Sequence, residues 1–481
     1  MLIPETGKWY AEVVFSSGGQ HSSFGVINPI DGSSLVNLEF STSQEQIRAD
    51  NSYLESSTES WGNGNVLGIK VDRDAGTIQF TVDGTNASTA VNLSEMNNSS
   101  QLVFTTSRTE GGGAAVAGSF NFGQRPFSHL PTDYKSLCTA NLDDPSINLP
   151  NKHFDTLLYT GNGTDNTDRT GLNFQPDLVW IKGRSAAKFH SLYDSVRGAG
   201  QVIYSSMTNG EGTDTGLKAF NSDGFRNGTN QHTNENATTY AAWNWNAGGS
   251  TVTNNDGSIE SQVRANTTAG FSIVSYTGTG STATIGHGLG VAPKVVIVKR
   301  RSAAEDWIVG IGPILGSGEE GHYVKLNSTA AKATGNGPFN STNPSSSVVT
   351  LGTDVSTNGS SSTYISYCFS EVAGFSKFGK YSGNGNDNGT FVYTGFRPAY
   401  VVVKSTSGYS WDSHDSTRNP FNNADLSLAL NLDNAESTYD AKDFLSNGFK
   451  LKSTSNSINK SGNTYVYLAF AESPLKYARA R

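Results

Sequence analysis

Three copies of one residue pattern run through most of this chain, and this repetition constrains the fold more than any other feature. Each copy begins with the phrase Tyr-Thr/Ser-Gly-x-Gly, at Tyr159, Tyr276 and Tyr381, and a proline follows each tyrosine at the same spacing. Each proline opens an apolar run that ends in lysine, and an aromatic-rich run closes each copy. The proline-led runs are PDLVWIK, PKVVIVK and PAYVVVK, and the closing runs are TYAAWNW, TYISYCF and TYVYLAF. Anchors that recur in one order predict homologous structural units. These units are repeat 1 (152–250), repeat 2 (269–373) and repeat 3 (375–481), with a linker at 251–268.

The repeated runs predict an all-β fold. The proline-led runs are apolar on both faces of a strand, which is typical of a central strand buried between two layers. Gly, Ser, Thr and Asn are abundant and only 16% of residues are charged, as in all-β proteins with many turns. We therefore expect tandem β-sandwich units. The glycines of the repeated phrase are expected to form a turn, because no helical pattern follows them to make a phosphate-binding loop.

Residues 1–125 lack the repeat and have a pattern of their own. GKWYAEVVF and FGVIN read as strands, LGIKVDRDAGTIQFTVDG as a hairpin, and GSFNFGQRPF ends the unit. In this order they resemble the SPRY domain, a concanavalin-like β-sandwich. Only six residues precede GKWY, whereas a SPRY domain usually has earlier strands. That edge is therefore expected to be open, covered by another subunit, or absent. Four prolines in 126–151 predict an extended linker.

The whole arrangement resembles virion proteins of marine bacteriophages. The FNFGQRPF ending, the linker, the repeats and the terminal YVYLAFAESPLKYARAR carry this resemblance. It implies a virion protein, in the tail fibre or associated with the tail, that attaches to the host surface through loops of its β-sandwiches. The implied partners are other virion or tail proteins, further copies of the chain in a homo-oligomer such as a trimer, and a host glycan or protein. A scaffold, neck or capsid-decoration role without host contact is the alternative, and a glycan depolymerase is a third.

Charge and cysteine content exclude several classes of function. The formal charge of −8 argues against nucleic acid, whose phosphates require a basic surface. No apolar run is long enough to insert into a membrane, and the start MLIPETGKWYAEV shows no secretory signal. Cys138 and Cys368 lie in different segments, so no disulfide framework is expected.

Repeats 1 and 3 share a polar set that repeat 2 lacks. SLYDSVRG contains Asp194 and Arg197, and SHDSTRNP contains Asp415 and Arg418, whereas VGIGP stands near that place in repeat 2. One interpretation is a ligand site in which arginine and carboxylate bind sugar hydroxyls. The favoured interpretation is an ion pair that fixes a loop. Both repeats later carry F-x-S-D/N-G-F, which predicts a hairpin.

Aromatic residues in polar loops give further candidates for ligand binding. Trp61 lies in STESWGNGN, and Tyr409 and Trp411 lie in SGYSWDSHD. Such a composition suits an adaptable binding surface, or a lid that packs on its own sandwich. No metal-ligand spacing or nucleophile motif marks a catalytic site, so we expect no enzyme and no cofactor. Asn- and Asp-rich turns at GNGTDNTDR and GNGNDNG leave open a weak structural calcium ion.

Overall fold

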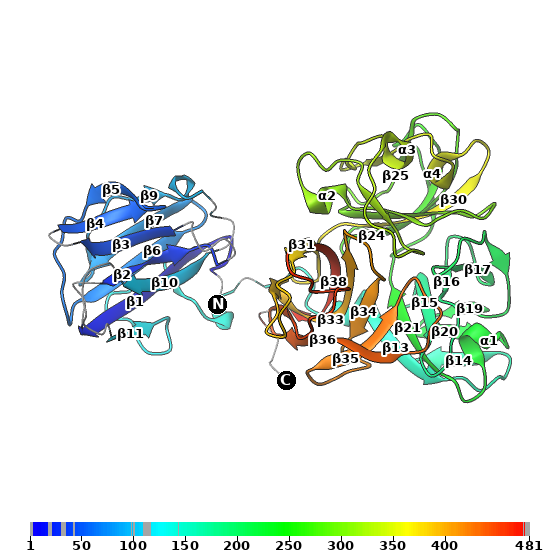
Figure 1. Ribbon diagram of the computed structural model, residues 1–481, viewed down its shortest axis with the longest axis horizontal. Coiled ribbons are helices and arrows are strands. Elements are labelled where there is room, and N and C mark those ends of the chain that lie inside the picture. Colours follow the sequence, from blue (N-terminus) through cyan, green and yellow to red (C-terminus); the bar gives the residue numbers. More distant parts are fainter. Residues whose placement is uncertain are drawn as a thin grey trace. The chain divides into compact units, whose positions relative to one another are not determined.

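The computed structural model describes residues 3–17, 22–29, 35–41, 44–97, 99, 102–108, 117–142, 144–474 and 476. The chain divides into two compact units, unit 1 (Met1–Asp143) and unit 2 (Asp144–Arg481). Strands dominate both units, and nearly all of their pairings are antiparallel (Figure 1). The predicted all-β sandwich fold is therefore confirmed.

Unit 1 is a sandwich of two sheets. The first sheet has the order β11-β1-β6-β7-β8, with β12 added to β1 and β9 to β7, and the second has the order β10-β2-β3-β4-β5. The strands are β1 (Lys8–Ser17), β2 (Ser22–Ile27), β3 (Leu35–Ser41), β4 (Gln44–Ala49), β5 (Ser52–Ser56), β6 (Val66–Asp72), β7 (Thr77–Val82), β8 (Thr85–Asn86), β9 (Val91–Asn92), β10 (Val103–Arg108), β11 (Ala117–Asn121) and β12 (Lys135–Ser136). Val13 and Ile69 of the first sheet and Val26 and Leu38 of the second share one core. The β6–β7 pair is the hairpin that the sequence predicts.

Strand β1 is not an open edge, and the predicted linker begins as part of unit 1. β1 pairs with β6 on one side and with β11 and β12 on the other. The backbone N–H groups of Ser128 and His129 donate to the Glu12 carboxylate at 3.0 and 2.7 Å. A buried carboxylate requires such donors. This segment therefore packs on β1, and both sides of the GKWY strand are paired within the chain.

The three repeats of unit 2 are built to one plan. Each has a main sheet in which a first strand, the closing strand, the proline-led strand and two further strands follow in order. A second, smaller sheet accompanies it in repeats 1 and 2, whereas the corresponding strands of repeat 3 continue the main sheet. Repeat 1 has β13 (Phe154–Thr160), β14 (Thr167–Thr170), β15 (Leu178–Gly183), β16 (Ser191–Asp194), β17 (Gln201–Tyr204), β18 (Gly212–Thr213), β19 (Ala219–Asn221), β20 (Gly224–Asn227), α1 (Gln231–Asn234) and β21 (Thr239–Trp245). Repeat 2 has β24 (Phe271–Thr277), β25 (Ala283–Gly286), β26 (Val295–Arg300), β27 (Ile308–Gly310), α2 (Gly312–Leu315), β28 (Tyr323–Lys325), α3 (Asn336–Phe339), β29 (Val348–Leu351), α4 (Val355–Asn358) and β30 (Thr363–Phe369). Repeat 3 has β31 (Ser376–Ser382), β32 (Phe391–Tyr393), β33 (Phe396–Ser405), β34 (Asp412–Asp415), β35 (Ala424–Ala429), β36 (Ser437–Leu445), β37 (Gly448–Leu451) and β38 (Thr464–Pro474).

The segment 251–268, predicted as a linker, belongs to the sheet of repeat 2. It forms β22 (Val252–Asn254) and β23 (Ser261–Asn266), and β23 pairs with β24. The side chains of Ser261 and Val263 are buried while Gln262 between them is exposed. This alternation is that of a strand with one face on a core, which explains why the segment joins the sheet.

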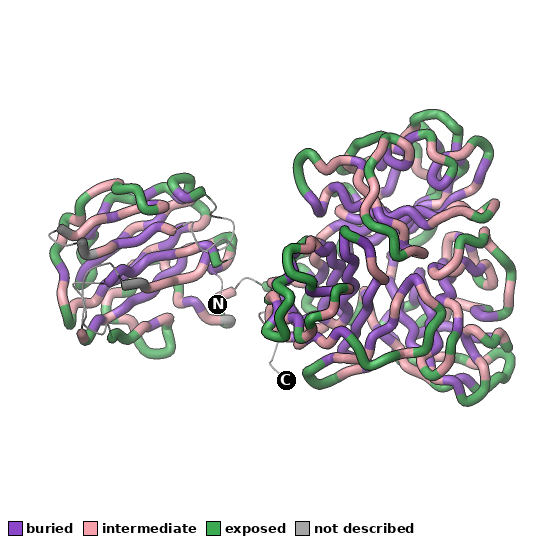
Figure 2. The backbone as a smooth tube through the Cα atoms, viewed as in Figure 1, coloured by how far each residue is buried: buried purple, intermediate pink, exposed green. Residues whose placement is uncertain are grey.

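Each proline-led strand is buried on both faces, as predicted, and in β15 and β26 the two faces serve different cores, whereas both faces of β33 belong to one core. In β15, Val179 and Ile181 face the core of repeat 1, whereas Leu178 and Trp180 enter a core common to all three repeats. Their counterparts in β26 and β33 enter the same common core. Figure 2 shows the buried residues running along these strands and the exposed residues in the loops. The three repeats of unit 2 are thus joined by one shared hydrophobic core.

The repeated phrase forms a turn, and its two glycines have different tasks. A Cβ on Gly161 would lie 2.1 Å from the carbonyl oxygen of Glu235, so only glycine permits this backbone approach. Gly163 instead has a φ of 67°, in the left-handed region. The buried Asn234 holds the turn, because its Oδ1 accepts from the Asn162 N–H and its Nδ2 donates to two carbonyls. Asn358 and Asn459 make the same contacts in repeats 2 and 3.

Candidate functional site

Side chains from each repeat reach into the preceding repeat at one structural position, and this position closes the three repeats into a ring. In each repeat a tryptophan or histidine directly precedes the strand after the proline-led strand. Its ring nitrogen contacts a backbone carbonyl of the preceding repeat, at the last residue of β17, β28 or β35. The contacts are Trp307 Nε1 to Tyr204 O at 2.9 Å, Trp411 Nε1 to Lys325 O at 2.9 Å, and His190 Nε2 to Ala429 O at 3.1 Å. The last contact joins repeat 1 to repeat 3. Unit 2 is therefore a closed pseudo-threefold body.

The lysines that end the proline-led strands form a second ring of contacts. Each is buried, and each Nζ donates to a carbonyl of its own repeat and to one of the preceding repeat. The contacts between repeats are Lys182 to Asp433 O, Lys299 to Thr208 O and Lys404 to Thr329 O, at 3.1, 2.7 and 3.3 Å. Burial lowers the pKa of each lysine to about 8. These lysines fasten the repeats to one another.

The predicted Asp-Arg sets lie at the boundaries between repeats. Arg197 Nε contacts Asp194 Oδ2 at 2.5 Å, and Asp194 Oδ2 also accepts from Tyr367 Oη of repeat 2 at 2.8 Å. In repeat 3, Arg418 Nε contacts Asp415 Oδ2 at 2.5 Å, and Asp415 accepts from Trp243 Nε1 of repeat 1 at 3.0 Å. The side chains of both pairs are fully buried. The favoured interpretation, a structural ion pair, accounts for these contacts.

Repeat 2 is apolar where the other repeats carry this pair. The register of β26 with β27 places Ile311 where Asp194 and Asp415 stand, and Ile314 where the arginines stand. On the closing strand of repeat 3, Leu468 stands at the position that Trp243 and Tyr367 hold on the closing strands of repeats 1 and 2. All three apolar residues belong to the common core. The charged pair and its neutral partner have thus been replaced together.

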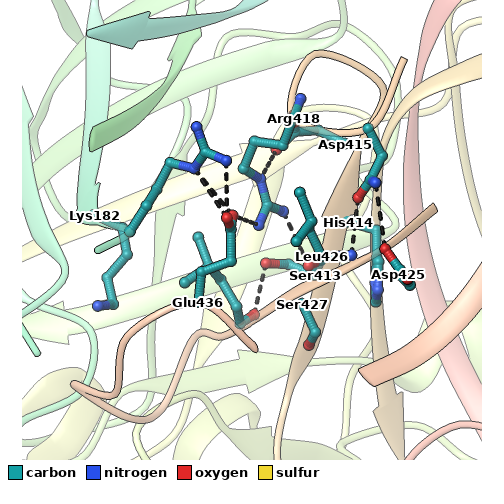
Figure 3. A network of polar contacts seen from close by, with 12 residues as sticks. Lys182, Ser413, His414, Asp415, Arg418, Asp425, Leu426, Ser427 and Glu436 are labelled. Atoms are coloured by element: carbon teal, nitrogen blue, oxygen red, sulfur yellow. Dashed lines mark hydrogen bonds and ion pairs between the residues drawn. The ribbon is translucent and has the colours of Figure 1, made fainter. Parts of the chain in front are cut away.

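Each ion pair extends into a network that crosses a boundary. Figure 3 shows Glu436 beside Arg418, whose Nη1 lies 2.9 Å from Glu436 Oε1. Nη2 of Arg184, from repeat 1, lies 2.8 Å from the other oxygen, Oε2. Although burial alone would raise the pKa of Glu436, hydrogen bonds from Arg184 and the charge of Arg418 hold it below its usual value. Glu211 receives Arg197 and Arg301 in the same way. These polar groups satisfy one another.

The aromatic residues predicted for ligand contact lie mostly inside the protein. Trp61 is 4% exposed, and its ring stacks on Phe15 with centroids 5.8 Å apart. Trp411 is 2% exposed and belongs to the ring of contacts described above. Tyr409 is half-buried with a φ of 73°, and its carbonyl accepts from Lys404. Of the two interpretations of these loops, the burial of Trp61 and Trp411 agrees with rings that pack inside the protein, because a large ring gains more from burial than a polar loop predicts.

The polar turns predicted as weak calcium sites use their oxygens internally. Asp165 pairs with Lys218, and Asp168 pairs with Arg226, at 2.9 and 2.7 Å. Asn384 and Asn386 accept from backbone N–H groups two residues ahead in Asx turns. Within the described ranges, no group of three His, Cys, Asp or Glu side chains could hold a metal ion. None of the helices described is long and apolar enough to cross a membrane.

The candidate surface for ligand contact is an exposed aromatic face on repeat 3, which sequence reasoning missed. Of the four exposed large aromatic side chains in the described part of the chain, three belong to repeat 3: Phe391, Phe421 and Tyr439, at 43%, 72% and 54% exposure. Phe391 lies on β32 over Gly448, where a Cβ would meet its ring at 3.1 Å. Asn422 bonds both backbone groups of Phe444 and so fixes Phe421 beside β36. The outward alternation of β36, at Tyr439, Asp443 and Leu445, was the available signal.

This aromatic face (Phe391, Tyr393, Phe421, Tyr439 and Leu445) combines rings with polar neighbours. Strand pairing places Lys450 next to Phe391, with Asp443 on the far side of Lys450. Rings beside hydrogen-bonding groups can stack on sugar faces while the polar groups bond hydroxyls. A separate apolar cavity of about 40 Å³ lies in the common core, lined by Trp245, Phe369 and Phe470 among others, and belongs to the packing of the repeats.

The comparisons with known proteins place unit 2 in a family. No curated protein matches the sequence. The family model described as "Domain of unknown function (DUF7483)" matches residues 149–474, the span of all three repeats. The match treats the repeats as one domain, as does their shared core. The chain therefore belongs to the DUF7483 family.

Proposed function

We propose that this protein is a structural component of a bacteriophage particle, in or near the tail, that attaches to a glycan of the host surface through the aromatic face of repeat 3. The observation that carries the attachment is that three of the four exposed large aromatic rings in the described part of the chain belong to repeat 3, on or beside its outer strands β32 and β36. The place in the particle rests on the resemblance of the sequence to marine phage virion proteins.

The construction of unit 2 supports a display role over catalysis. The Asp, Arg, His and Lys side chains of the repeated positions bond across the boundaries between repeats, where they stabilise the body. A closed body of this kind holds its outer loops in fixed positions, which limits the entropy lost when a ligand binds. Several copies in one particle would add their weak contacts together. Assembly as a homo-oligomer is part of this proposal, and light scattering tests it.

Binding of the full chain to cells tests the proposal. Labelled protein is added to a panel of marine bacterial isolates and to their purified surface polysaccharides, with the wild type beside Phe391→Ala/Phe421→Ser. The control is Tyr53→Ser, which removes an exposed ring of 56% exposure from unit 1. Saturable binding that falls at least tenfold in the double variant and not in the control supports the proposal. Equal binding by both variants contradicts the assigned face. No binding by any form favours the scaffold role, and sugar release favours the depolymerase.

A further inference from the structure

A buried cluster of reactive groups lies in repeat 3 and has no counterpart in the other repeats. Asp412 and His414 project from β34 into the sandwich, and Lys442 and Asp440 project from the inward face of β36. Their exposed fractions are 3%, 0%, 0% and 4%. The corresponding β-strand positions in repeat 1 hold Ser191 and Tyr193. No ligand can reach such a cluster, so any chemistry in it involves its own side chains.

The amine and the carboxylate of this cluster are in direct contact. Lys442 Nζ donates to Asp412 Oδ2, and Ser427 Oγ donates to Asp412 Oδ1 at 2.6 Å. The contact joins residues 30 positions apart in the chain. It is enclosed by protein on every side, because water is excluded at both partners. An amine held on a carboxyl group in a dry site is placed to condense with it, because fixed proximity gives the two groups a high effective concentration.

A proton acceptor stands beside the amine. His414 Nε2 lies 3.2 Å from the carbonyl oxygen of Tyr439, which can only accept, so the Nε2 position carries the hydrogen. The Nδ1 atom lies 3.0 Å from Lys442 Nζ and 3.1 Å from Asp412 Oδ2, so it stands beside both reacting groups. Burial first, and then the charges of Lys442 and Arg418, lower the pKa of His414 despite the nearby Asp412. The neutral imidazole is in place to receive a proton from the ammonium group.

A proton donor stands on the same face of β36 as the lysine. Burial, together with the negative charge of Asp412, raises the pKa of Asp440 to about 7. Its Oδ1 is buried without a hydrogen-bond partner in the described structure. Lys442 Nζ also donates to the Asp440 carbonyl at 3.2 Å, which fixes the two residues beside each other. A protonated carboxyl group here can donate to the oxygen that leaves Asp412.

We propose that Lys442 and Asp412 condense to an amide cross-link within repeat 3, with His414 as the proton acceptor and Asp440 as the proton donor. Nζ of Lys442 attacks Cγ of Asp412, so that one N–C bond forms and one C–O bond breaks. The ammonium group gives up two protons, which pass through His414 and Asp440 to the departing oxygen and leave with it as water. His414 and Asp440 return to their starting states. The reaction requires no oxidant, reductant or other reactant.

Mass spectrometry of the denatured full chain tests the cross-link. The expected intact mass is lower than that of the sequence by one water molecule. Trypsin is expected to leave Lys442 uncut and to release a branched peptide that joins 405–418 to the peptide containing Lys442. The branched peptide distinguishes the cross-link from a succinimide at an Asp-Gly pair, which loses the same mass. A full sequence mass together with cleavage at Lys442 in the wild type overturns the proposal, whether or not any variant folds.

Variants assign the roles. Lys442→Arg is expected to restore the full mass, and Asp440→Asn to slow the loss of water at least tenfold in freshly purified protein. The control is Lys218→Arg, since Lys218 holds the corresponding place before the hairpin of repeat 1 but pairs with Asp165 at the surface. The control is expected to keep the mass loss. Unchanged condensation in Asp440→Asn would overturn the role of Asp440 as the proton donor.

Discussion

Replacement of Trp307 by phenylalanine tests whether the three repeats are one folding unit. The indole is fully buried, and its N–H donates across the boundary to the Tyr204 carbonyl at 2.9 Å. That carbonyl keeps only the Met207 N–H at 3.3 Å when the indole is lost. We expect a cost of about 1 kcal/mol for the hydrogen bond. The smaller ring leaves a gap in the common core that costs a further ~1–2 kcal/mol.

This cost is expected to appear in the unfolding of the whole of unit 2. Differential scanning calorimetry of the full chain should show one transition for each unit, and Trp307→Phe should lower only that of unit 2. For a unit of this size we expect a shift of about 3–4 °C. Trp61→Phe is the control and should move only the transition of unit 1. Three separable transitions in unit 2, of which one moves, would refute a shared core.

Four further perturbations follow from the same contacts. Ile311→Asp places a carboxylate in the common core without a partner, because Ile314 stands where the other repeats have an arginine. We expect the free energy of unfolding, measured by denaturant titration, to fall by about 3–5 kcal/mol. A decrease under about 1 kcal/mol would contradict the replacement of the ion pair by apolar residues. Gly161→Ala forces a Cβ to 2.1 Å from a carbonyl oxygen and should cost about 1–3 kcal/mol, whereas Gly249→Ala meets nothing within 4 Å and should cost little in the same titration. The Lys404 pKa is about 8 in the folded protein against 10.5 for an ordinary lysine, so the unfolded chain binds more protons between these pH values. The difference in unfolding free energy between wild type and Lys404→Met should therefore rise in favour of wild type from pH 8 to 10.5. A difference that does not change with pH would argue against a buried amine. If the amide cross-link closes its loop of 30 residues, Lys442→Arg should lose about 3–4 kcal/mol by chain entropy, and an unfolding midpoint unchanged from wild type would count against it.

The repeated pattern was sufficient to predict the role of the proline-led strands, but it assigned 251–268, which forms β22 and β23 of repeat 2, to a linker. Apolar residues at every position of PDLVWIK can be satisfied only when both faces of the strand are covered, and the structure covers them with two different cores. The turn at Gly161 was equally readable, because two glycines so close together rarely serve anything else. The need of Gly161 for close backbone approach, however, depends on Glu235, a residue distant in the sequence.

The closure of the repeats into a ring could not be read from the sequence. His190 occupies the same place as Trp307 and Trp411, but it shares with them only a ring N–H. Their common task is defined by a carbonyl in another repeat. The polar loops around Trp61 and Trp411 gave no sign of burial for a related reason. Neighbours in the sequence describe only the local surroundings of a ring, whereas both rings are covered by residues distant in the sequence.

The aromatic face of repeat 3 was hidden by its spacing. Phe391, Phe421 and Tyr439 lie far apart along the chain, and none stands in a tryptophan-containing loop of the kind that favours ligand binding. The pairing of β32 with β37 and of β37 with β36 places Phe391 and Tyr439 on one sheet, and the bonds of Asn422 to Phe444 hold Phe421 beside it. The sequence showed that the Asp-Arg sets of repeats 1 and 3 correspond to each other. It could not show that Asp194 and Asp415 also bond to a residue of another repeat.

Native-state hydrogen exchange tests the closed pseudo-threefold body most directly. The closing strands β21, β30 and β38 occupy equivalent central places in the three repeats, each between the first strand and the proline-led strand. If one core holds the repeats together, the most protected amides of all three strands should exchange with the same free energy, and Trp307→Phe should lower that value equally in each. Different free energies in the three strands, or a decrease confined to β30, would contradict the account.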